Sequence, residues 1–382
     1  MAGHIFLVAA EASGDALGAD LMAALRARDP TLRFSAIGGA AMAAAGAPSA
    51  VRTDDLAILG FVEGLKAWRR VAQRADEAAD AIVAAKPDAV VLIDSWGFTL
   101  RVAQRLKARL PQTPRIKYVG PQVWATRPGR AKTLAAAVDH LICIHAFETP
   151  FYAPYGLACT VAGNPALGRV TPGEGAAFRA RHGVDAGAPL LLVLPGSRRS
   201  EVQRIGPVFW EAAKRLGAAR PALRTAIVLA GPVADLARAQ APKDALMVGE
   251  HEKDDAFAAA NAALAASGTV TTEVAAQGAP VIVGYKMGWI TWALARFFLL
   301  RSRYISLMNV AAGREIAPEI IQTRFTATNL LRAAAPLLDD PAARATQIAA
   351  QNAALDAMGR GARPAAEIAA EAVLAVMAAS AR

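Results

Sequence analysis

Short continuous runs of apolar residues recur along the chain, and segments of helical length separate them. Runs such as Ala89–Ile93 and Leu190–Leu194 show no polar alternation, which is typical of strands buried on both faces of a parallel sheet. The pattern therefore predicts an α/β protein built from βαβ units. The predicted strands are Ile5–Ala9, Phe34–Ile37, Ala89–Ile93, Ile116–Val119, Leu141–Ile144, Leu190–Leu194, Thr225–Leu229, Ala245–Val248, Ala262–Ala265 and Val281–Tyr285.

The stretch from Gly163 to Pro189 is rich in glycine, proline and alanine and precedes a new strand, so we place an interdomain linker there. We predict a doubly wound domain at residues 1–165, a linker at 166–188, a second doubly wound domain at 189–340, and C-terminal helices at 341–382. These last helices are expected to pack on the first domain or on a partner subunit. Two such domains would face a central cleft with the carboxyl ends of their strands, where open α/β sheets bind ligands.

Polar residues follow the strands of the first domain. The segment EASGD, at the start of a predicted helix, contributes the candidates Glu11, Ser13, Gly14 and Asp15. Backbone N–H groups at such a helix start suit an anion or sugar hydroxyls, and the alternative is an ordinary helix cap. Asp94 directly follows an apolar strand and is a candidate general base or, equally, a helix N-cap.

The loop YVGPQVWATRPGR carries an aromatic ring and a guanidinium group, Trp124 and Arg127. Loops with such residues bind ligands more often than they stabilise cores. We interpret this loop as a contact for a phosphorylated or acylated sugar acceptor. The alternative is a solvated basic loop.

Two segments of the second domain indicate a site for a nucleotide diphosphate. The loop LPGSRRSEV offers backbone donors and a cation through Gly196, Ser197 and Arg198, with helix capping as the weaker alternative. In ASGTVTTE, the residues Ser267, Gly268 and Thr269 begin a helix of weak helix formers. Glu273 shares a face with Thr269, so its carboxylate is the candidate partner of ribose hydroxyls.

A third segment of this domain, NVAAGREIAPEIIQ, contains further polar candidates. Pro318 is expected at the first position of a helix, on which Glu319 and Gln322 would share one face. Asn309 precedes them. We expect all three side chains at the nucleotide-sugar site, and the alternative is a surface helix.

Composition and the absence of known motifs exclude several classes of function. The 382 residues carry a net charge of +10, which suits nucleic acid, an anionic membrane, phosphorylated substrates or simple solubility. No RNA-binding or zinc-finger motif is present, so nucleic acid is disfavoured. Neither GxGxxG nor a P-loop is present, and no metal-ligand spacing occurs, so we expect no cofactor and no metal. Two cysteines without partners and an N-terminus unlike a signal peptide indicate the cytoplasm.

Two segments combine aromatic and basic residues in a way typical of membrane surfaces. The first contributes Ile58, Phe61, Val62, Leu65 and Trp68, with Lys66, Arg69, Arg70 and Arg74 beside them. The second contributes Trp289, Trp292, Phe297 and Phe298, with Arg296, Arg301 and Arg303. A core-facing helix remains the alternative for the first segment.

The order of these motifs resembles that of the lipid-A-disaccharide synthases. The segments that carry the resemblance are EASGDALGADL, LGFVEGL, VLID, YVGPQVWA, FETPFYAPYG, LPGSRRSEV, ASGTVTTE, IVGYK and NVAAGREIAPEIIQ. They extend from about Ile5 to Gln322. The resemblance implies a GT-B glycosyltransferase of two Rossmann-like domains.

The resemblance also implies the reaction and the roles of residues. UDP-2,3-diacylglucosamine would be joined to 2,3-diacylglucosamine 1-phosphate (lipid X) through a β-1,6 bond, with inversion, release of UDP and no metal. Asp94 would be the base and Arg198 the arginine on the donor, while the candidates from Ser267 to Gln322 would line the UDP-sugar site. The family would be dimeric and peripheral on the inner face of the inner membrane.

The sequence departs from the family pattern at Trp96, Gly97, Thr126 and Asn164, on the acceptor side or at the hinge. These departures bear on acceptor identity and acyl-chain preference more than on the UDP site. Two other functions fit the same residues. One is a UDP-sugar epimerase of the same fold, and the other is a non-catalytic protein that binds a nucleotide sugar or a lipid.

Overall fold

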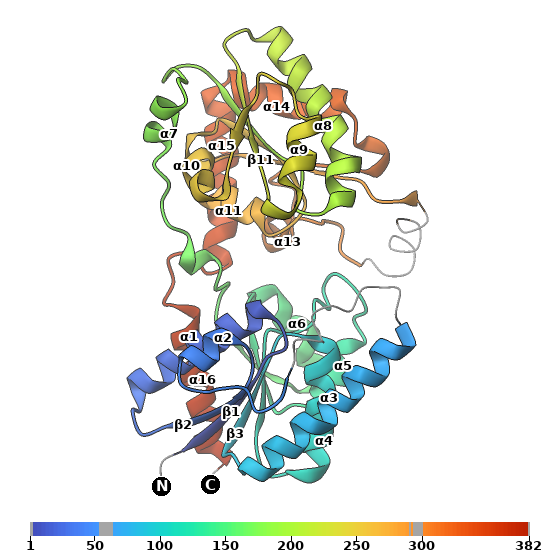
Figure 1. The fold of residues 1–382 in the computed structure, drawn as a ribbon, viewed down its shortest axis with the longest axis vertical. Coiled ribbons are helices and arrows are strands. Elements are labelled where there is room, and N and C mark those ends of the chain that lie inside the picture. The colour runs from blue at the N-terminus through green and yellow to red at the C-terminus, as the bar shows by residue number, and fades with distance from the viewer. Residues whose placement is uncertain (1–2, 53–63, 290–291, 293–300, 381–382) are drawn as a thin grey trace. The chain divides into compact units, whose positions relative to one another are not determined.

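The computed structural model describes residues 3–52, 64–289, 292 and 301–380. It divides into two compact units, and Figure 1 shows that the first contains both the blue N-terminal part of the chain and the red helix near the C-terminus. Unit 1 comprises residues 1–168 and 361–382, and unit 2 comprises residues 169–360. Each unit contains one parallel sheet of six strands with helices on its faces.

The sheet of unit 1 has the strand order β2-β1-β3-β4-β5-β6. Its strands are β1 (His4–Val8), β2 (Arg33–Ile37), β3 (Ala89–Ile93), β4 (Arg115–Tyr118), β5 (His140–Cys143) and β6 (Ala158–Val161). Its helices are α1 (Ala12–Arg28), α2 (Ala40–Ala44), α3 (Gly64–Ala85), α4 (Trp96–Arg109), α5 (Arg130–Ala135), α6 (Thr149–Tyr152) and α16 (Ala365–Ser380).

The central strands β1 and β3 are buried on both faces of this sheet, which explains why these two strands lack polar alternation. Val90 and Leu92 of β3 join a core layer with α3 and α4, while Val91 and Ile93 join a layer with α1 and α16. Helix α16 packs against α1 although the whole of unit 2 separates them in sequence. The C-terminal segment of the chain is therefore part of the first core.

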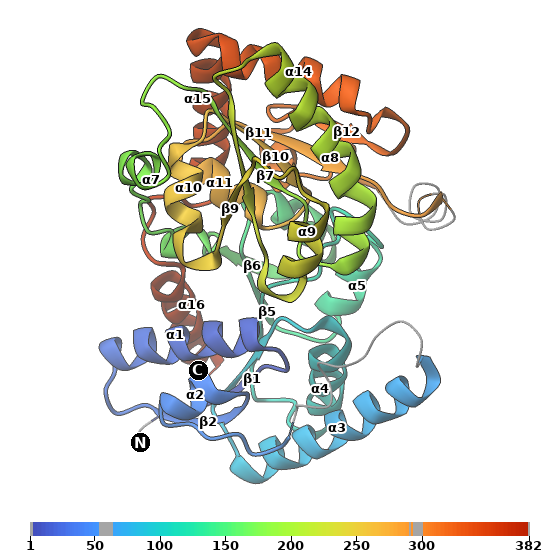
Figure 2. The same cartoon turned by 45° about the horizontal axis from the view of Figure 1, so that its top comes forward.

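The sheet of unit 2 has the order β12-β11-β10-β7-β8-β9. Its strands are β7 (Leu190–Leu194), β8 (Arg224–Val228), β9 (Leu246–Val248), β10 (Ala262–Ala266), β11 (Val281–Tyr285) and β12 (Glu319–Ile321). Its helices are α7 (Gly175–Arg181), α8 (Arg199–Ala219), α9 (Ala234–Gln240), α10 (Lys253–Ala259), α11 (Val270–Ala276), α13 (Leu307–Ala312), α14 (Ala327–Asp339) and α15 (Pro341–Ala357). Helices α8 and α14 pack together over one face of this sheet (Figure 2).

All ten strands predicted from the sequence are present, with ends that differ by at most a residue or so. The sequence analysis missed β6 and β12, and its helix beginning at Pro318 is wrong, because Glu319–Ile321 pairs with β11 as a strand. The segment expected as a linker contains α7, which packs on α10 within unit 2. The helices beyond residue 340 divide, since α15 belongs to unit 2 and α16 to unit 1.

Among the described residues, no helix is long and apolar enough to cross a membrane. Most of the two aromatic and basic segments proposed for a membrane surface falls outside the residues that the structure describes. In the part that is described, the Trp289 side chain is 62% exposed.

Candidate active site

In unit 1, the polar residues after β1 and the residue after β3 lie at the same edge of the sheet. Strands β1 and β3 are hydrogen-bonded neighbours, with Val8 beside Leu92, so their carboxyl ends coincide. Gly14 lets α1 approach the end of β1 closely, since a Cβ atom there would lie only 3.2 Å from Cβ of Ala9. Glu11 and Ser13 are exposed at the start of α1. The fold thus brings these two side chains to the edge that carries Asp94.

Asp94 and Ser95 both adopt left-handed backbone conformations, with φ of 45° and 42°. Such conformations cost free energy in residues other than glycine and cluster at functional sites. The turn is fixed by hydrogen bonds from the Asp94 N–H to the Tyr118 carbonyl, 2.9 Å, and from the Thr99 hydroxyl to the Asp94 carbonyl, 2.7 Å. Asp94 is therefore held in one strained arrangement at the end of β3.

A buried lysine that the sequence analysis missed lies under this turn. Lys117 of β4 is 2% exposed, and its Nζ donates to the Asp94 carbonyl and, at 2.7 Å, to the Thr99 hydroxyl. Burial lowers the pKa of Lys117 to about 7, while the nearby Asp94 carboxylate acts in the opposite direction. The signal in the sequence was a lysine in a short strand directly before the YVGP loop.

The structure gives Asp15, a candidate on the acceptor side, a capping role within unit 1. Its carboxylate is buried and accepts hydrogen bonds from the backbone N–H groups of Gly39, Ala41 and Met42, at 2.8, 2.7 and 3.1 Å. These bonds cap α2, so Asp15 satisfies backbone donors of unit 1. Asp15 is thus a helix cap, as the alternative interpretation stated, but it caps α2 and not its own helix, α1.

The loop after β4 forms an aromatic and basic group in unit 1. The Trp124 ring meets Phe147 edge to face, with centroids 5.4 Å apart, and the exposed Arg127 has a φ of 48°. Trp96, one of the departures from the family pattern, lies under the Arg130 guanidinium at 5.3 Å. The substituted tryptophan therefore contacts this basic loop.

The remaining departures make only local backbone contacts in the described structure. The Asn164 side chain accepts a hydrogen bond from the Ala166 N–H at 3.0 Å, and the Thr126 N–H donates to the Gln122 carbonyl at 3.0 Å. At Gly97, near the start of α4, a Cβ atom would lie 3.9 Å from the Arg101 guanidinium, which donates a hydrogen bond to the Gly97 carbonyl.

In unit 2, the two loops expected at a nucleotide diphosphate are neighbours. Strands β7 and β10 pair with Leu194 beside Ala265, so the loop at 195–198 and the loop at 267–269 leave the same edge of the sheet. Helix α8 follows the first loop and α11 follows the second, with Thr269 directly before α11. Arg198 projects from this edge, and 76% of its side chain is exposed.

Glu201, which was not among the candidate site residues, shapes the first of these loops through the helix capping that the sequence analysis gave as the alternative. Its carboxylate accepts hydrogen bonds from the N–H groups of Ser197 and Arg198, at 3.1 and 3.3 Å, and from the Arg198 guanidinium at 2.9 Å. Capping therefore occupies two backbone donors that were expected to meet a diphosphate. The exposed Arg198 guanidinium remains the cation of this loop.

Glu273 lies one turn into α11 and is about one-third exposed. One of its carboxylate oxygens lies 3.3 Å from Nζ of Lys253, at the start of α10. The Lys253 side chain is exposed to a similar extent. Lys253 also pairs with Glu250 at 2.7 Å. A carboxylate with one ionic partner retains lone pairs for the hydroxyls of a ligand.

The polar residues near the end of unit 2 form a buried network. The Asn309 amide donates to Glu319 at 2.8 Å and its oxygen accepts from Ile316 and Ala317. Glu319 also accepts from the N–H groups of Ile305 and Ser306. Burial raises the pKa of Glu319, and these hydrogen bonds act against that shift.

Gln322 has a similar internal role. Its side chain forms two hydrogen bonds with the backbone of Met287, at 3.2 and 3.0 Å, and it is buried with a φ of 53°. Asn309, Glu319 and Gln322 thus hold the loops that follow β11 and precede β12, and their side chains have partners within the protein.

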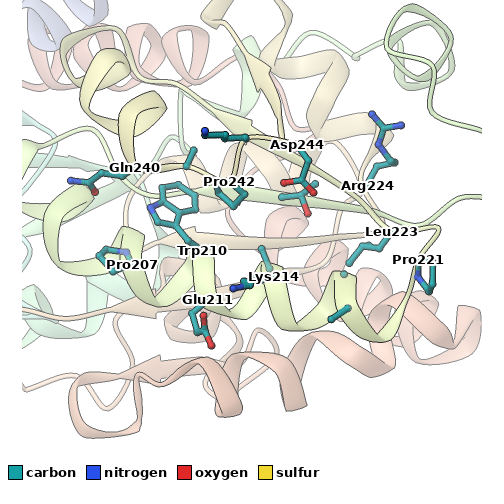
Figure 3. Close-up of a pocket in the computed structure, with 16 residues that line it drawn as sticks. Pro207, Trp210, Glu211, Lys214, Pro221, Leu223, Arg224, Gln240, Pro242 and Asp244 are labelled. Carbon is teal, nitrogen blue, oxygen red and sulfur yellow. The ribbon is translucent and has the colours of Figure 1, made fainter.

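A cavity of about 780 Å³ lies elsewhere in unit 2, between α8 and the segments around β8 and β9 (Figure 3). Its lining includes Trp210, Lys214, Arg224 and Asp244, and none of the candidate residues contributes to it. No group of His, Cys, Asp and Glu side chains within the described ranges is arranged to hold a metal ion.

Comparisons with known proteins assign this arrangement to a family. The family model described as lipid-A-disaccharide synthetase matches residues 5–373. The lipid-A-disaccharide synthase of Rhodospirillum centenum is 40% identical over 379 residues, which cover 98% of this chain and 94% of that protein. The enzyme of the same name from Nitrobacter hamburgensis is 40% identical, with 99% and 96% covered.

Solved structures share the architecture at low identity. The UDP-GlcNAc 2-epimerase of Neisseria meningitidis, bound to UDP-GlcNAc, has a TM-score of 0.62 at 14% identity, with 98% of this chain and 100% of that chain covered. The calicheamicin glycosyltransferase CalG4 has a TM-score of 0.60 at 15% identity, with both chains fully covered. The fold is GT-B, as the resemblance implied. With the family model matching nearly the whole chain, this protein belongs to the lipid-A-disaccharide synthase family, glycosyltransferases of lipid A biosynthesis.

Proposed function

We propose that the protein joins UDP-2,3-diacylglucosamine to 2,3-diacylglucosamine 1-phosphate and releases UDP. The product is the β-1,6-linked disaccharide 1-phosphate, formed with inversion at the anomeric carbon. Family membership supports a glycosyltransferase of lipid A biosynthesis, and the family's name, a synthase of the lipid A disaccharide, supports these two substrates. The observation that carries the chemical assignment is Asp94, held in a strained turn at the carboxyl end of β3.

In this proposal Asp94 acts as the general base. Its carboxylate takes the proton from the 6-hydroxyl of the acceptor while that oxygen attacks the anomeric carbon of the donor. The bond between the anomeric carbon and the UDP oxygen breaks, and the negative charge moves onto the diphosphate. Arg198 of unit 2 stabilises that charge through its exposed guanidinium. Glu11, Ser13, Trp124 and Arg127 contact the acceptor.

The rest of the nucleotide-sugar site is assigned in the same way. Ser197, Ser267 and Thr269 offer hydroxyls next to Arg198, and Gly196 and Gly268 leave room for the diphosphate. Glu273 accepts hydrogen bonds from the ribose hydroxyls. Asn309, Glu319 and Gln322 support the loops around the sugar, because their own hydrogen bonds are made within the protein.

We also propose that the protein works as a homodimer on the cytoplasmic face of the inner membrane, where it takes both lipid-linked substrates from the leaflet. The net charge of +10 favours an anionic surface, and Trp289 offers an exposed ring beside a basic segment. Sedimentation with anionic and neutral vesicles, and measurement of the mass in solution, test these two points.

The reaction is tested by incubating the protein with the donor, with and without the acceptor, and identifying products by mass spectrometry. We expect UDP release only with the acceptor present, together with the disaccharide 1-phosphate. An equal rate of UDP release with and without the acceptor, or formation of a 2-epimerised donor, would contradict the proposal. Asp94→Asn is expected to abolish turnover and retain UDP binding. Asp76→Asn, which changes an exposed carboxylate on α3, is the control and should remain active.

A further inference from the structure

Lys117 is a charged residue in the middle of a parallel sheet. It lies on β4, beside Leu92 of β3. Alternation along β4 places its side chain in the core layer under α4, opposite to Ile116 and Tyr118, which face α1 and α16. A fully buried lysine is rare because desolvation of an ammonium group is costly, so its position requires a physical reason.

The contacts of Lys117 converge on the turn that carries Asp94. Its Nζ donates to the Asp94 carbonyl and to the Thr99 hydroxyl. The Thr99 hydroxyl lies 2.7 Å from the Asp94 carbonyl and 3.0 Å from the Ser95 carbonyl. The two side chains therefore hold both residues of the left-handed pair from below.

This arrangement is compatible with a neutral amine as well as with an ammonium group. A neutral lysine amine has two N–H donors, and Nζ has two acceptors here, the Asp94 carbonyl and the Thr99 hydroxyl. Burial brings the pKa of Lys117 down to about 7, against the opposing effect of the Asp94 carboxylate. In the same core layer, a hydrogen bond with Cys159 and burial raise the pKa of the Cys143 thiol, which stays neutral. Both protonation states of the amine can therefore donate these two hydrogen bonds.

We propose that Lys117 is a positioning residue for the Asp94 base, acting with Thr99 to fix the left-handed Asp94–Ser95 turn and so aim the Asp94 carboxylate at the acceptor hydroxyl. This inference rests on the proposed role of Asp94. Lys117 does not touch the substrate in this account. It acts through the backbone of the catalytic residue. Small displacements there lower the reaction rate strongly, because a shift of about 1 Å can reduce the rate about 100-fold.

The first test compares Lys117→Met with the wild-type protein. Methionine is close in size and removes both hydrogen bonds, and replacing a buried charge with an apolar group often preserves stability. We expect kcat to fall by about 10- to 100-fold. The dissociation constant of UDP and the KM of the donor should stay within twofold, because unit 2 supplies the proposed nucleotide site. A kcat within twofold of wild type in a folded Lys117→Met protein would overturn the inference.

The second test uses Thr99, which changes the same contacts with less risk to folding. Thr99→Val is isosteric and removes the hydroxyl, whereas Thr99→Ser keeps it. We expect Thr99→Val to lower kcat and Thr99→Ser to remain close to wild type. Because both side chains act on one turn, the double variant Lys117→Met/Thr99→Val should lose little more than Lys117→Met alone. Equal kcat values for Thr99→Val and Thr99→Ser would contradict the proposal even if Lys117→Met does not fold.

The catalytic role of Asp94 and the positioning role of Lys117 can be contradicted separately. If Asp94→Asn is inactive while the Lys117 and Thr99 variants keep full kcat, Asp94 remains the base and the positioning role is wrong. If Asp94→Asn keeps full turnover, the proposed base is wrong and the positioning role falls with it.

Discussion

The guanidinium of Arg198 donates a hydrogen bond to the carboxylate of Glu201 at 2.9 Å, yet 76% of the arginine side chain is exposed. The pair lies three residues apart, where α8 begins, and the same carboxylate also caps the N–H groups of Ser197 and Arg198. Glu201 is itself nearly buried. One side of the guanidinium is therefore fixed by the protein, and the other side is free to meet an anion.

Arg198→Ala should weaken UDP binding with little effect on folding. A charge-assisted hydrogen bond contributes about 1.5–3 kcal/mol, so we expect the dissociation constant of UDP to rise about 10- to 100-fold. Isothermal titration calorimetry measures this directly. Arg215→Ala is the matched control, because it removes an exposed arginine further along α8 that pairs with Glu211. Equal losses in both variants would indicate a general charge effect and contradict a specific contact.

Gly196→Ala should disrupt the same loop. Gly196 has a φ of 109°, and a Cβ atom there would lie 2.5 Å from the Glu201 carboxylate, so the loop must move. We expect a loss of about 1–3 kcal/mol in the free energy of unfolding and weaker binding of UDP. Gly217→Ala in α8 is the control, since nothing lies within 4 Å of its Cβ position. Alanine there should be neutral or stabilising in urea unfolding.

Asp15→Ala should reduce stability, in contrast to the nearby Glu11→Ala. Removal of the Asp15 carboxylate leaves the N–H groups of Gly39, Ala41 and Met42 without their acceptor. We expect the free energy of unfolding to fall by about 1–3 kcal/mol, as measured by urea titration. Glu11 is exposed and makes no capping hydrogen bond, so Glu11→Ala should unfold like the wild type while losing activity towards the acceptor. A stable Asp15→Ala protein would contradict the capping role.

Glu148 makes stability depend on pH. Burial raises its pKa from the ordinary 4.5 to about 7, although the His145 N–H donates to it at 3.0 Å. The folded protein therefore keeps this proton between about pH 4.5 and 7, while the unfolded chain releases it. The contribution to stability is present at low pH and is lost as pH rises through that window.

Glu148→Gln, which mimics the neutral acid, should not suffer this loss. The difference in unfolding free energy between Glu148→Gln and the wild type should grow from pH 4.5 to pH 7 and then level off. Burial also lowers the pKa of His145 to about 4, so its ring stays neutral across most of this range. Urea unfolding at a series of pH values gives the result, and a constant difference would rule out a protonated Glu148.

The sequence was most informative where burial alone decides the structure. The strands Ala89–Ile93 and Leu190–Leu194 are apolar throughout because both faces are covered, and the structure has the same bounds. The missed strand β6 is a half-exposed edge strand, so its sequence carries little of that pattern. The other missed strand, β12, was predicted as a helix, because Pro318 and Glu319 are typical of a helix start. Its pairing with β11 is a tertiary contact.

In the candidate site, too, some residues could be predicted from the sequence and others depend on tertiary contacts. The positions of Asp94 and Arg198 followed from the rule that functional residues lie at the carboxyl ends of parallel strands. Lys117 and Glu201 were missed, because their roles depend on the direction of side chains towards a neighbouring loop. Local spacing does not contain that information. A lysine in the segment RIKY has the pattern of an alternating strand, and only the cover of α4 makes it buried.

Helix α16 has a consequence for the order in which the chain is made. Its residues Ala369, Ala370 and Val373 belong to the same core layer as Ile5 and Leu7, close to the other end of the chain. A ribosome must synthesise all of residues 169–360 before this helix emerges. Until then one face of the first sheet lacks part of its cover, and the second unit has every residue it needs. The half of the protein that is translated first is therefore the half that is completed last.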